Sequence, residues 1–422
     1  MKIQRSTLAF WVPFIGLLVL VQVLSSVGIL SNFWVTLLKI GAVMSIICLG
    51  LNLIYGFNGQ FSLGQWGFYA IGAYAGADIT YRWTQLHSAS GLVVVLLVVL
   101  LVALAFILVS KLMSRLRGLD TLSGFTLYII GLLMAAVIAI FIGRYLINPI
   151  TNLLNLLPLN IASQIVFFFA VLLGGGVAAE VSYIFGFPVL TLGSDYFGIA
   201  TLGFSIIVKV LLDNSDTLLG FEEMKGARGM IGIPKMTSWI WVSIFLVIVI
   251  IVTRNLLHST HGRAIISVRE DEIAAKAMGI NISQQKTITF VLGSFFAGLA
   301  GALYAHVNGF LHPNTFSFIK TFDPMIIIVF GGLGSVTGTV AAAFTWALVL
   351  EGLLRLVLPQ GFETWRYVIY PLLLLVLMLL RPQGLFGTFE FPYLRQILPP
   401  IFQPRNSAKP TETVNEIPGD GA

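Results

Sequence analysis

Residues 254–286, RNLLHSTHGRAIISVREDEIAAKAMGINISQQK, form the longest polar run in a chain that is otherwise nearly all apolar, and this contrast decides the fold class. The run carries the signals of a short helix. Ser267 and Glu270 have the spacing of a capping box, in which both side chains satisfy free N–H groups at a helix start. Gly279 is a typical C-terminal cap. We therefore predict a helix over about residues 268–278, between two membrane spans.

The charges of this predicted helix suit its dipole, with acidic residues in the first turn and Lys276 near the end. Glu272 precedes Lys276 by four residues, which favours an ion pair. Two interpretations remain open: an amphipathic loop helix on lipid headgroups, or a docking helix that fits a groove on a soluble partner. The acidic residues are Glu270, Asp271 and Glu272, and the predicted apolar side consists of Ile273, Ala274, Ala277 and Met278.

The composition is that of a membrane protein. The 422 residues are 57% hydrophobic and only 10% charged, whereas a soluble domain carries roughly a quarter charged residues. Apolar runs of spanning length recur along the chain, which predicts an all-α polytopic membrane protein with about 10–12 transmembrane or half-membrane helices. In such a protein the net charge of +6 reports topology and does not indicate nucleic acid binding.

Signatures of catalysis and metal binding are missing from the sequence. There is no GxxxxGK[ST] phosphate loop, so we expect the chain to bind no ATP and no other cofactor. Cys48 is the single cysteine, and the five histidines include no HExxH pattern, so neither a disulfide nor a metal site is expected. We expect the chain not to be an enzyme.

The apolar runs also predict a topology. Lys2 and Arg5 precede the first run, which fits an uncleaved first helix better than a signal peptide. An amino terminus inside the cell places more basic residues inside than outside, and it makes the 254–286 loop cytoplasmic. The predicted spans cover about residues 8–27, 33–55, 91–110, 122–143, 161–179, 237–253, 287–307, 339–358 and 365–380.

Two glycine-rich regions interrupt this regular pattern. Residues 51–80, LNLIYGFNGQFSLGQWGFYAIGAYAGADIT, have a glycine density that destabilises a helix unless there is a reason for it. One reason is close helix packing through small residues, and the other is a broken helix whose free backbone groups and amides line a path. Residues 177–213 repeat the texture, with Pro188 before a helix that opens at Ser194 and Asp195. Asp195 also fits a simple N-cap.

The last third of the chain predicts a half-helix and a tail. Residues 323–333 are apolar but too short to span, and the glycines of GGLGSVTG at 331–338 would close them with a turn. Residues 403–422 are polar and predicted to be disordered. In the span at 287–307, small residues form a face that should pack closely on a neighbour: Gly293, Ser294, Ala297, Gly298 and Gly301.

Several of these stretches resemble a known family. LNLIYGFNGQFSLGQWGFYAIGAY, SDYFGIATLGF, GRAIISVREDEIAAKAMGINISQQKTITFVLGSFFAGLAGALYA, GGLGSVTGTVAAA and RPQGLFG, in this order, are similar to the LivM-type permeases of branched-chain amino acid ABC importers. The resemblance covers roughly residues 33–80 and 175–388. Residues 111–170 do not match and are expected to be an insertion, and the basic residue that the family has before the Gly-Asp-Tyr stretch is absent at Thr191–Ser194.

The resemblance implies a function, a place and partners. It implies a permease domain over residues 1–402 in the bacterial inner membrane, carrying leucine, isoleucine or valine. It also implies a second, homologous permease, two cytoplasmic ATPases that use ATP, and a periplasmic or lipid-anchored binding protein. The family's coupling helix falls on the residues from Val268 to Gly279: Val268, Arg269, Glu270, Asp271, Glu272, Ile273, Ala274, Ala277, Met278 and Gly279. Residues expected to line the translocation path are Asn52, Gln60, Ser62 and Asp195.

Other functions stay open at this point. A related ABC permease for urea, short amides or other amino acids would carry nearly the same motifs. An ion-coupled secondary transporter would instead need carboxylates within the membrane, for which the candidates are Asp78, Glu180 and Asp195. A purely structural membrane scaffold would not need helices broken by glycine.

Overall fold

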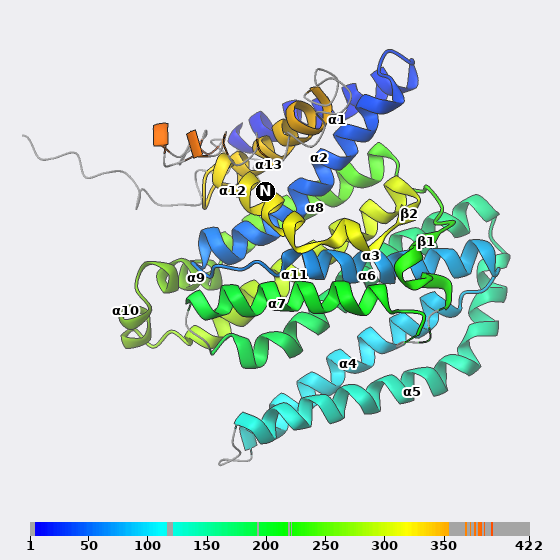
Figure 1. Cartoon of the computed structure of the whole chain (residues 1–422), viewed down its shortest axis with the longest axis horizontal. Helices are drawn as coiled ribbons and strands as arrows, with labels where there is room; N and C mark the ends of the chain where they lie inside the picture. Colours follow the sequence, from blue (N-terminus) through cyan, green and yellow to red (C-terminus); the bar gives the residue numbers. More distant parts are fainter. Residues whose placement is uncertain are drawn as a thin grey trace, which may run out of the picture.

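The computed structural model describes residues 5–115, 121–191, 194–217, 220 and 222–353, with single residues between 368 and 390. These residues form a bundle of helices with two short strands (Figure 1). Two helices, α9 and α10, lie at one end of the bundle, and strands β1 and β2 lie at the other (Figure 1). The ends are called here the α10 end and the β1 end.

The long helices follow the apolar runs. In chain order they are α1 (Arg5–Ser26), α2 (Asn32–Leu51), α3 (Gln65–Gln85), α4 (Ser90–Arg115), α5 (Thr121–Asn155), α6 (Leu159–Val189), α7 (Ser194–Asp213), α8 (Trp239–His258) and α11 (Ile282–Asn308). Shorter elements connect or extend them: the π-helix η1 (Asn52–Phe57), α9 (Thr260–Glu270), α10 (Glu272–Ala277), α12 (Phe322–Gly331), α13 (Val336–Thr345) and the π-helix η6 (Trp346–Leu353).

Eight helices in the described part of the chain are long and apolar enough to cross a membrane. The predicted all-α polytopic membrane fold is confirmed. Two spans are longer than predicted, because α5 continues past Arg144 and through Pro149 to Asn155, and α6 continues to Val189. Two predicted segments lie outside the described residues: the tail at 403–422 and, apart from single residues, the span at 365–380.

The spans differ in how deeply they are buried. The most apolar windows of the α2–η1 helix and α11 are 83% and 72% buried, whereas those of α4 and α5 are 28% and 17% buried. Figure 1 shows α4 and α5 side by side along one edge of the bundle, packed on each other. The expected insertion at residues 111–170 includes all of α5 at this edge, but it also includes the start of α6, where Val166, Phe167 and Ala170 are fully buried.

Glycines bring three central helices into direct backbone contact. A Cβ at Gly72 of α3 would lie 2.2 Å from the carbonyl oxygen of Gly298 in α11, and one at Gly298 would lie 2.7 Å from Gly174 O in α6. A Cβ at Gly301 would meet Tyr69 O, again between α11 and α3. The small-residue face predicted for α11 therefore packs as expected, and packing explains part of the glycine density at 51–80.

At the β1 end the chain forms irregular connections. The 3-10 turns η2 (Glu222–Met224) and η3 (Gly226–Arg228) precede β1 (Met230–Ile231), which pairs antiparallel with β2 (Phe310–Leu311). Two further 3-10 turns, η4 (Pro313–Phe316) and η5 (Phe318–Thr321), lead into α12. The predicted half-helix is confirmed as α12, whose ten residues end before a turn at Gly332 and Gly334, both with positive φ.

Candidate functional site: the α9–α10 loop and the helix breaks beside it

The loop at the α10 end contains two helices and not the single helix predicted over 268–278. Asp271 has an extended backbone, with φ −159° and ψ 108°, and it separates α9 from α10. Its carboxylate accepts hydrogen bonds from Ile273 N at 2.8 Å and Ala274 N at 3.0 Å. Ser267 does not cap a helix start, since its hydroxyl donates to Ala264 O within α9. The predicted capping box is wrong because Asp271 supplies the cap four residues later.

The other end of α10 is closed as predicted. Gly279 has φ +81°, and its N–H donates to Lys276 O at 3.0 Å while Ile280 N donates to Ala275 O at 3.1 Å. These two hydrogen bonds form a Schellman motif, which satisfies carbonyl groups at the helix end. Glu272 pairs with Lys286 of α11 at 2.5 Å, and not with Lys276 as predicted. A six-residue helix is thereby held at both ends and tied to α11.

The apolar side chains of α10 point away from the protein. Ile273 is 84% exposed and Met278 is 82% exposed, and Ala274 and Ala277 are also exposed. Only Ala275 of this helix is buried. Ile273, Ala274, Ala277 and Met278 together form an exposed apolar face on a well-capped helix, and a contiguous face of this kind is typical of a contact surface.

The first helix break covers residues 58–64, between η1 and α3. Gln60 and Ser62, both predicted to line a path, are buried here. Gln60 Oε1 accepts from Asn58 Nδ2 at 2.9 Å, and Ser62 Oγ accepts from Gly64 N at 3.3 Å. Asn58 also donates to Thr289 of α11 at 2.9 Å.

Several amide atoms around this break have no partner among the described residues. They are Asn58 Oδ1, Gln285 Oε1, and both side-chain polar atoms of Gln65. Buried polar groups of this kind are normally satisfied by protein, water or a ligand. Asn58 and Gln65 belong to the polar residues interleaved with glycine at 51–80 but were not among the predicted path residues, and no signal in the sequence pointed to Gln285.

Asn52, also predicted to line the path, bonds to a distant turn. It lies in the first turn of η1, fully buried, and its Oδ1 accepts from Gly334 N at 2.9 Å. Its Nδ2 donates to Ser335 O at 2.9 Å and to Thr339 Oγ1 at 2.8 Å. The amide thus joins η1 to the turn between α12 and α13, and this bonding is that of a structural joint.

The two glycine-rich regions of the sequence pack against each other. Leu63 N donates to Thr201 Oγ1 of α7 at 3.0 Å, and Ser205 Oγ donates to Leu63 O at 3.2 Å. A Cβ at Gly198 would lie 2.5 Å from the ring of Phe61. Asp195 lies in the first turn of α7, so it shares this region, but its side chain is outside the described part of the structure.

The α12–α13 turn also receives a group from the C-terminal part of the chain. Glu390 Oε1 accepts from Val336 N at 2.6 Å, and Oε2 accepts from Thr337 Oγ1 at 2.6 Å. A carboxylate suits this position, at the N-terminus of α13. Burial nevertheless raises the pKa of Glu390, while its hydrogen bonds to Thr337 and Val336 act in the opposite direction.

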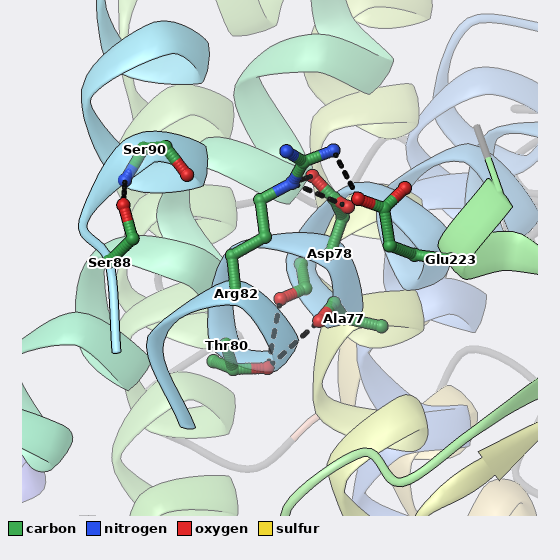
Figure 2. A network of polar contacts seen from close by, with 8 residues as sticks. Ala77, Asp78, Thr80, Arg82, Ser88, Ser90 and Glu223 are labelled. Carbon is green, nitrogen blue, oxygen red and sulfur yellow. Dashed lines mark hydrogen bonds and ion pairs between the residues drawn. The ribbon is translucent and has the colours of Figure 1, made fainter. Parts of the chain in front are cut away.

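The candidate intramembrane carboxylates differ in their pairing. Asp78 forms an ion pair with Arg82 at 3.0 Å, and Arg82 also pairs at 3.3 Å with Glu223 of η2 (Figure 2). This network fastens the β1-end connection onto α3. Glu180 of α6 has a buried Oε1 without a hydrogen-bond partner among the described residues. Among the described residues, no group of three or more His, Cys, Asp or Glu side chains is arranged so that it could hold a metal ion.

Comparison with known proteins agrees with this architecture. The family model for the permease component of branched-chain amino acid transport systems matches residues 142–378, more than half of the chain. LivM, a permease protein of a high-affinity branched-chain amino acid transport system in Salmonella typhimurium, is 32% identical over 247 residues, 50% of this chain and 56% of that protein. LivM of Escherichia coli gives the same identity and coverage.

LivH, another permease protein of such a system in E. coli, is 25% identical over 355 residues, 83% of this chain and 93% of LivH. No solved structure matches the chain. The chain spans little more than half the length of the LivM proteins it matches. The extent of the family match, together with the membrane-spanning helices, shows that this chain belongs to the family of permease components of branched-chain amino acid transport systems.

Proposed function

We propose that this chain is the transmembrane permease subunit of an ATP-driven importer for branched-chain amino acids. It forms the translocation path in the bacterial inner membrane with a second, homologous permease. Two cytoplasmic ATPases bind and hydrolyse ATP, and a periplasmic or lipid-anchored binding protein delivers leucine, isoleucine or valine. The chain itself binds lipid and substrate but no nucleic acid, and it holds no cofactor.

The observation that carries this proposal is the exposed α10 helix. Its cap at Asp271 and its Schellman motif at Gly279 keep it helical, and the Glu272–Lys286 ion pair ties it to α11. Ile273 and Met278 are left available for a groove on a partner. A short helix with two apolar anchors is a common recognition element, and an ATPase that changes shape could move it.

The helix breaks support a polar path through the subunit. Amide atoms of Asn58 and Gln65 that have no partner within the described ranges lie where α2–η1 ends and α3 begins. The free N–H groups at the start of a helix suit a carboxylate such as that of an amino acid. Gln60 and Ser62 remain predicted path residues, and Asn58 and Gln65 join them in place of Asn52.

The test is a pull-down in mild detergent that compares wild type with an Ile273→Asp/Met278→Asp double variant. Both side chains are more than four-fifths exposed, so the charges should not disturb folding. We expect wild type to recover ATPase subunits and a second permease, and the double variant to recover only the permease. Ile231→Asp is the matched control, since Ile231 is also exposed but lies in β1 at the opposite end.

A second variant, Ala274→Pro/Ala277→Pro, breaks the helix itself and should also lose the ATPases. Recovery of the ATPases with all variants would mean that α10 is not the docking helix. Failure of wild type to recover any ATPase would contradict the importer proposal as a whole.

A further inference from the structure

We propose that Arg269 is the positioning residue that transmits movement of α10 to the helix breaks in the membrane domain. This inference rests on the proposed function and names one contact through which it would work. Arg269 lies in the last turn of α9, two residues before the Asp271 cap that begins α10. Any displacement of α10 therefore reaches Arg269 through a very short piece of chain.

Arg269 contacts the end of the α2–η1 helix. Its Nη1 donates a hydrogen bond to Gly56 O, in the last turn of η1. Carbonyl groups at a helix C-terminus lack partners within the helix and carry the negative end of its dipole. A guanidinium is well suited to such a position, because it is always charged and has donors in a planar fork.

Two glycines leave room for the Arg269 side chain to pack closely on the neighbouring backbone. A Cβ at Gly59, which has φ +76°, would lie 3.3 Å from Arg269 Cγ. A Cβ at Gly334 would lie 3.2 Å from Arg269 Nη1. The arginine thus packs on the first residues of the break and on the α12–α13 turn at the same time.

Asn52 also joins the two segments that Arg269 contacts, the end of η1 and the α12–α13 turn. The Asn52 amide holds Gly334 N and Ser335 O from its place in η1. A Cβ at Gly56 would lie 2.7 Å from Gly334 N, so the backbones of η1 and the turn are in close contact. Movement of Arg269 should therefore shift the end of η1 and the turn as one unit, which we call the Arg269 joint.

The joint lies where the membrane helices can change direction. α3 begins after the break at 58–64, and α13 begins at Val336 just after the turn. A π-helix such as η1 is frequent at functional sites. A shift of the joint would change the start of both helices, next to the amides proposed to line the path.

The experiment measures transport and ATP hydrolysis on the same reconstituted complex of this chain with its second permease, ATPases and binding protein. The structure places Arg269 in α9, with its guanidinium on Gly56 O, and not in the exposed α10 helix. Arg269→Ala should therefore keep the ATPases bound and hydrolysing, while labelled leucine transported per ATP falls by about tenfold, within the range for disrupted coupling contacts. Arg263→Ala is the matched control on α9, since its guanidinium donates to His258 O, close by in sequence. It should leave the ratio unchanged.

Arg269→Lys keeps the charge and the stem that packs on Gly59, and it should give a partial loss. If Arg269→Ala does not accumulate in the membrane, Arg269→Lys is used for the measurement. An unchanged ratio of leucine to ATP in these variants would overturn the inference, and so would dissociation of the ATPases, which would make Arg269 a docking residue. If wild type binds no ATPase, the proposed function has failed before the joint is examined.

Discussion

Asn52 shows how one side chain can hold two distant segments together. Its amide makes three hydrogen bonds to the α12–α13 turn and α13, at distances of 2.8–2.9 Å, from a fully buried position. A buried group that loses its partner costs about 1–3 kcal/mol. Among the described residues, Gly334 N is bonded to this amide, whereas Ser335 O also accepts from Thr339 N at 3.2 Å and from Thr339 Oγ1 at 2.7 Å.

We predict that Asn52→Leu, which keeps the size of the side chain, lowers stability by about 2 kcal/mol because it leaves the part-buried Gly334 N–H without its partner. Thermal unfolding of the purified protein in detergent checks this. Asn214→Leu is the control, because Asn214 is exposed and its amide donates to Val210 O, one turn earlier in α7. Equal melting temperatures for wild type and Asn52→Leu would mean that the amide is not a joint, and lining of the path would again be the better explanation.

At the scale of elements, α3, α6 and α11 contact one another through one glycine on each helix. Gly72, Gly174 and Gly298 approach one another so closely that an added Cβ at any of them would lie less than 3 Å from the backbone of another. In lipid there is little hydrophobic drive between helices, so close packing through small residues supplies much of their association.

We predict that Gly72→Val separates α3 from α11, because overpacking a tight contact costs typically about 1–3 kcal/mol. The melting temperature in detergent and the uptake of labelled leucine should both fall. Gly203→Val in α7 is the matched control, since a Cβ at Gly203 has nothing within 4 Å. Equal losses in both variants would attribute the effect to valine in a helix and not to the contact.

For the whole molecule, the main alternative is a transporter driven by an ion gradient. That alternative needs a free carboxylate in the membrane. Asp78 is paired with Arg82 (Figure 2), which leaves Glu180, with its buried Oε1, as the side chain in the described structure to test.

We predict that leucine uptake into vesicles containing the full complex needs ATP inside, persists with an uncoupler, and is unchanged by Glu180→Gln. Urea should not be taken up, since the proposed path carries branched-chain amino acids. Uptake of labelled leucine and urea, each with and without ATP, measures this. Uptake that survives without the ATPases but collapses with an uncoupler would favour the ion-coupled alternative, and uptake of urea would favour a related ABC permease.

Local signals in the sequence were sufficient for much of the architecture. Apolar runs of spanning length predicted the polytopic helical fold. Within a membrane, a helix satisfies the hydrogen bonds of every backbone group inside its own segment. The half-helix α12 followed from its length and its glycines, and the close face of α11 followed from its small residues. The end of α10 at Gly279 was predictable, because helices commonly end at a position with a left-handed backbone conformation, and glycine adopts this conformation most easily.

The contacts that join distant segments were decided only by the tertiary structure. Arg269 lies 213 residues from Gly56, and Asn52 lies 283 residues from Ser335. A cap or an apolar stripe depends on residues a few positions apart, so sequence spacing reveals it. The packing of neighbouring segments decides whether Asn52 lines a path or holds a turn. It also decides whether Ser267 or Asp271 caps the helix. This packing is a property of the folded bundle.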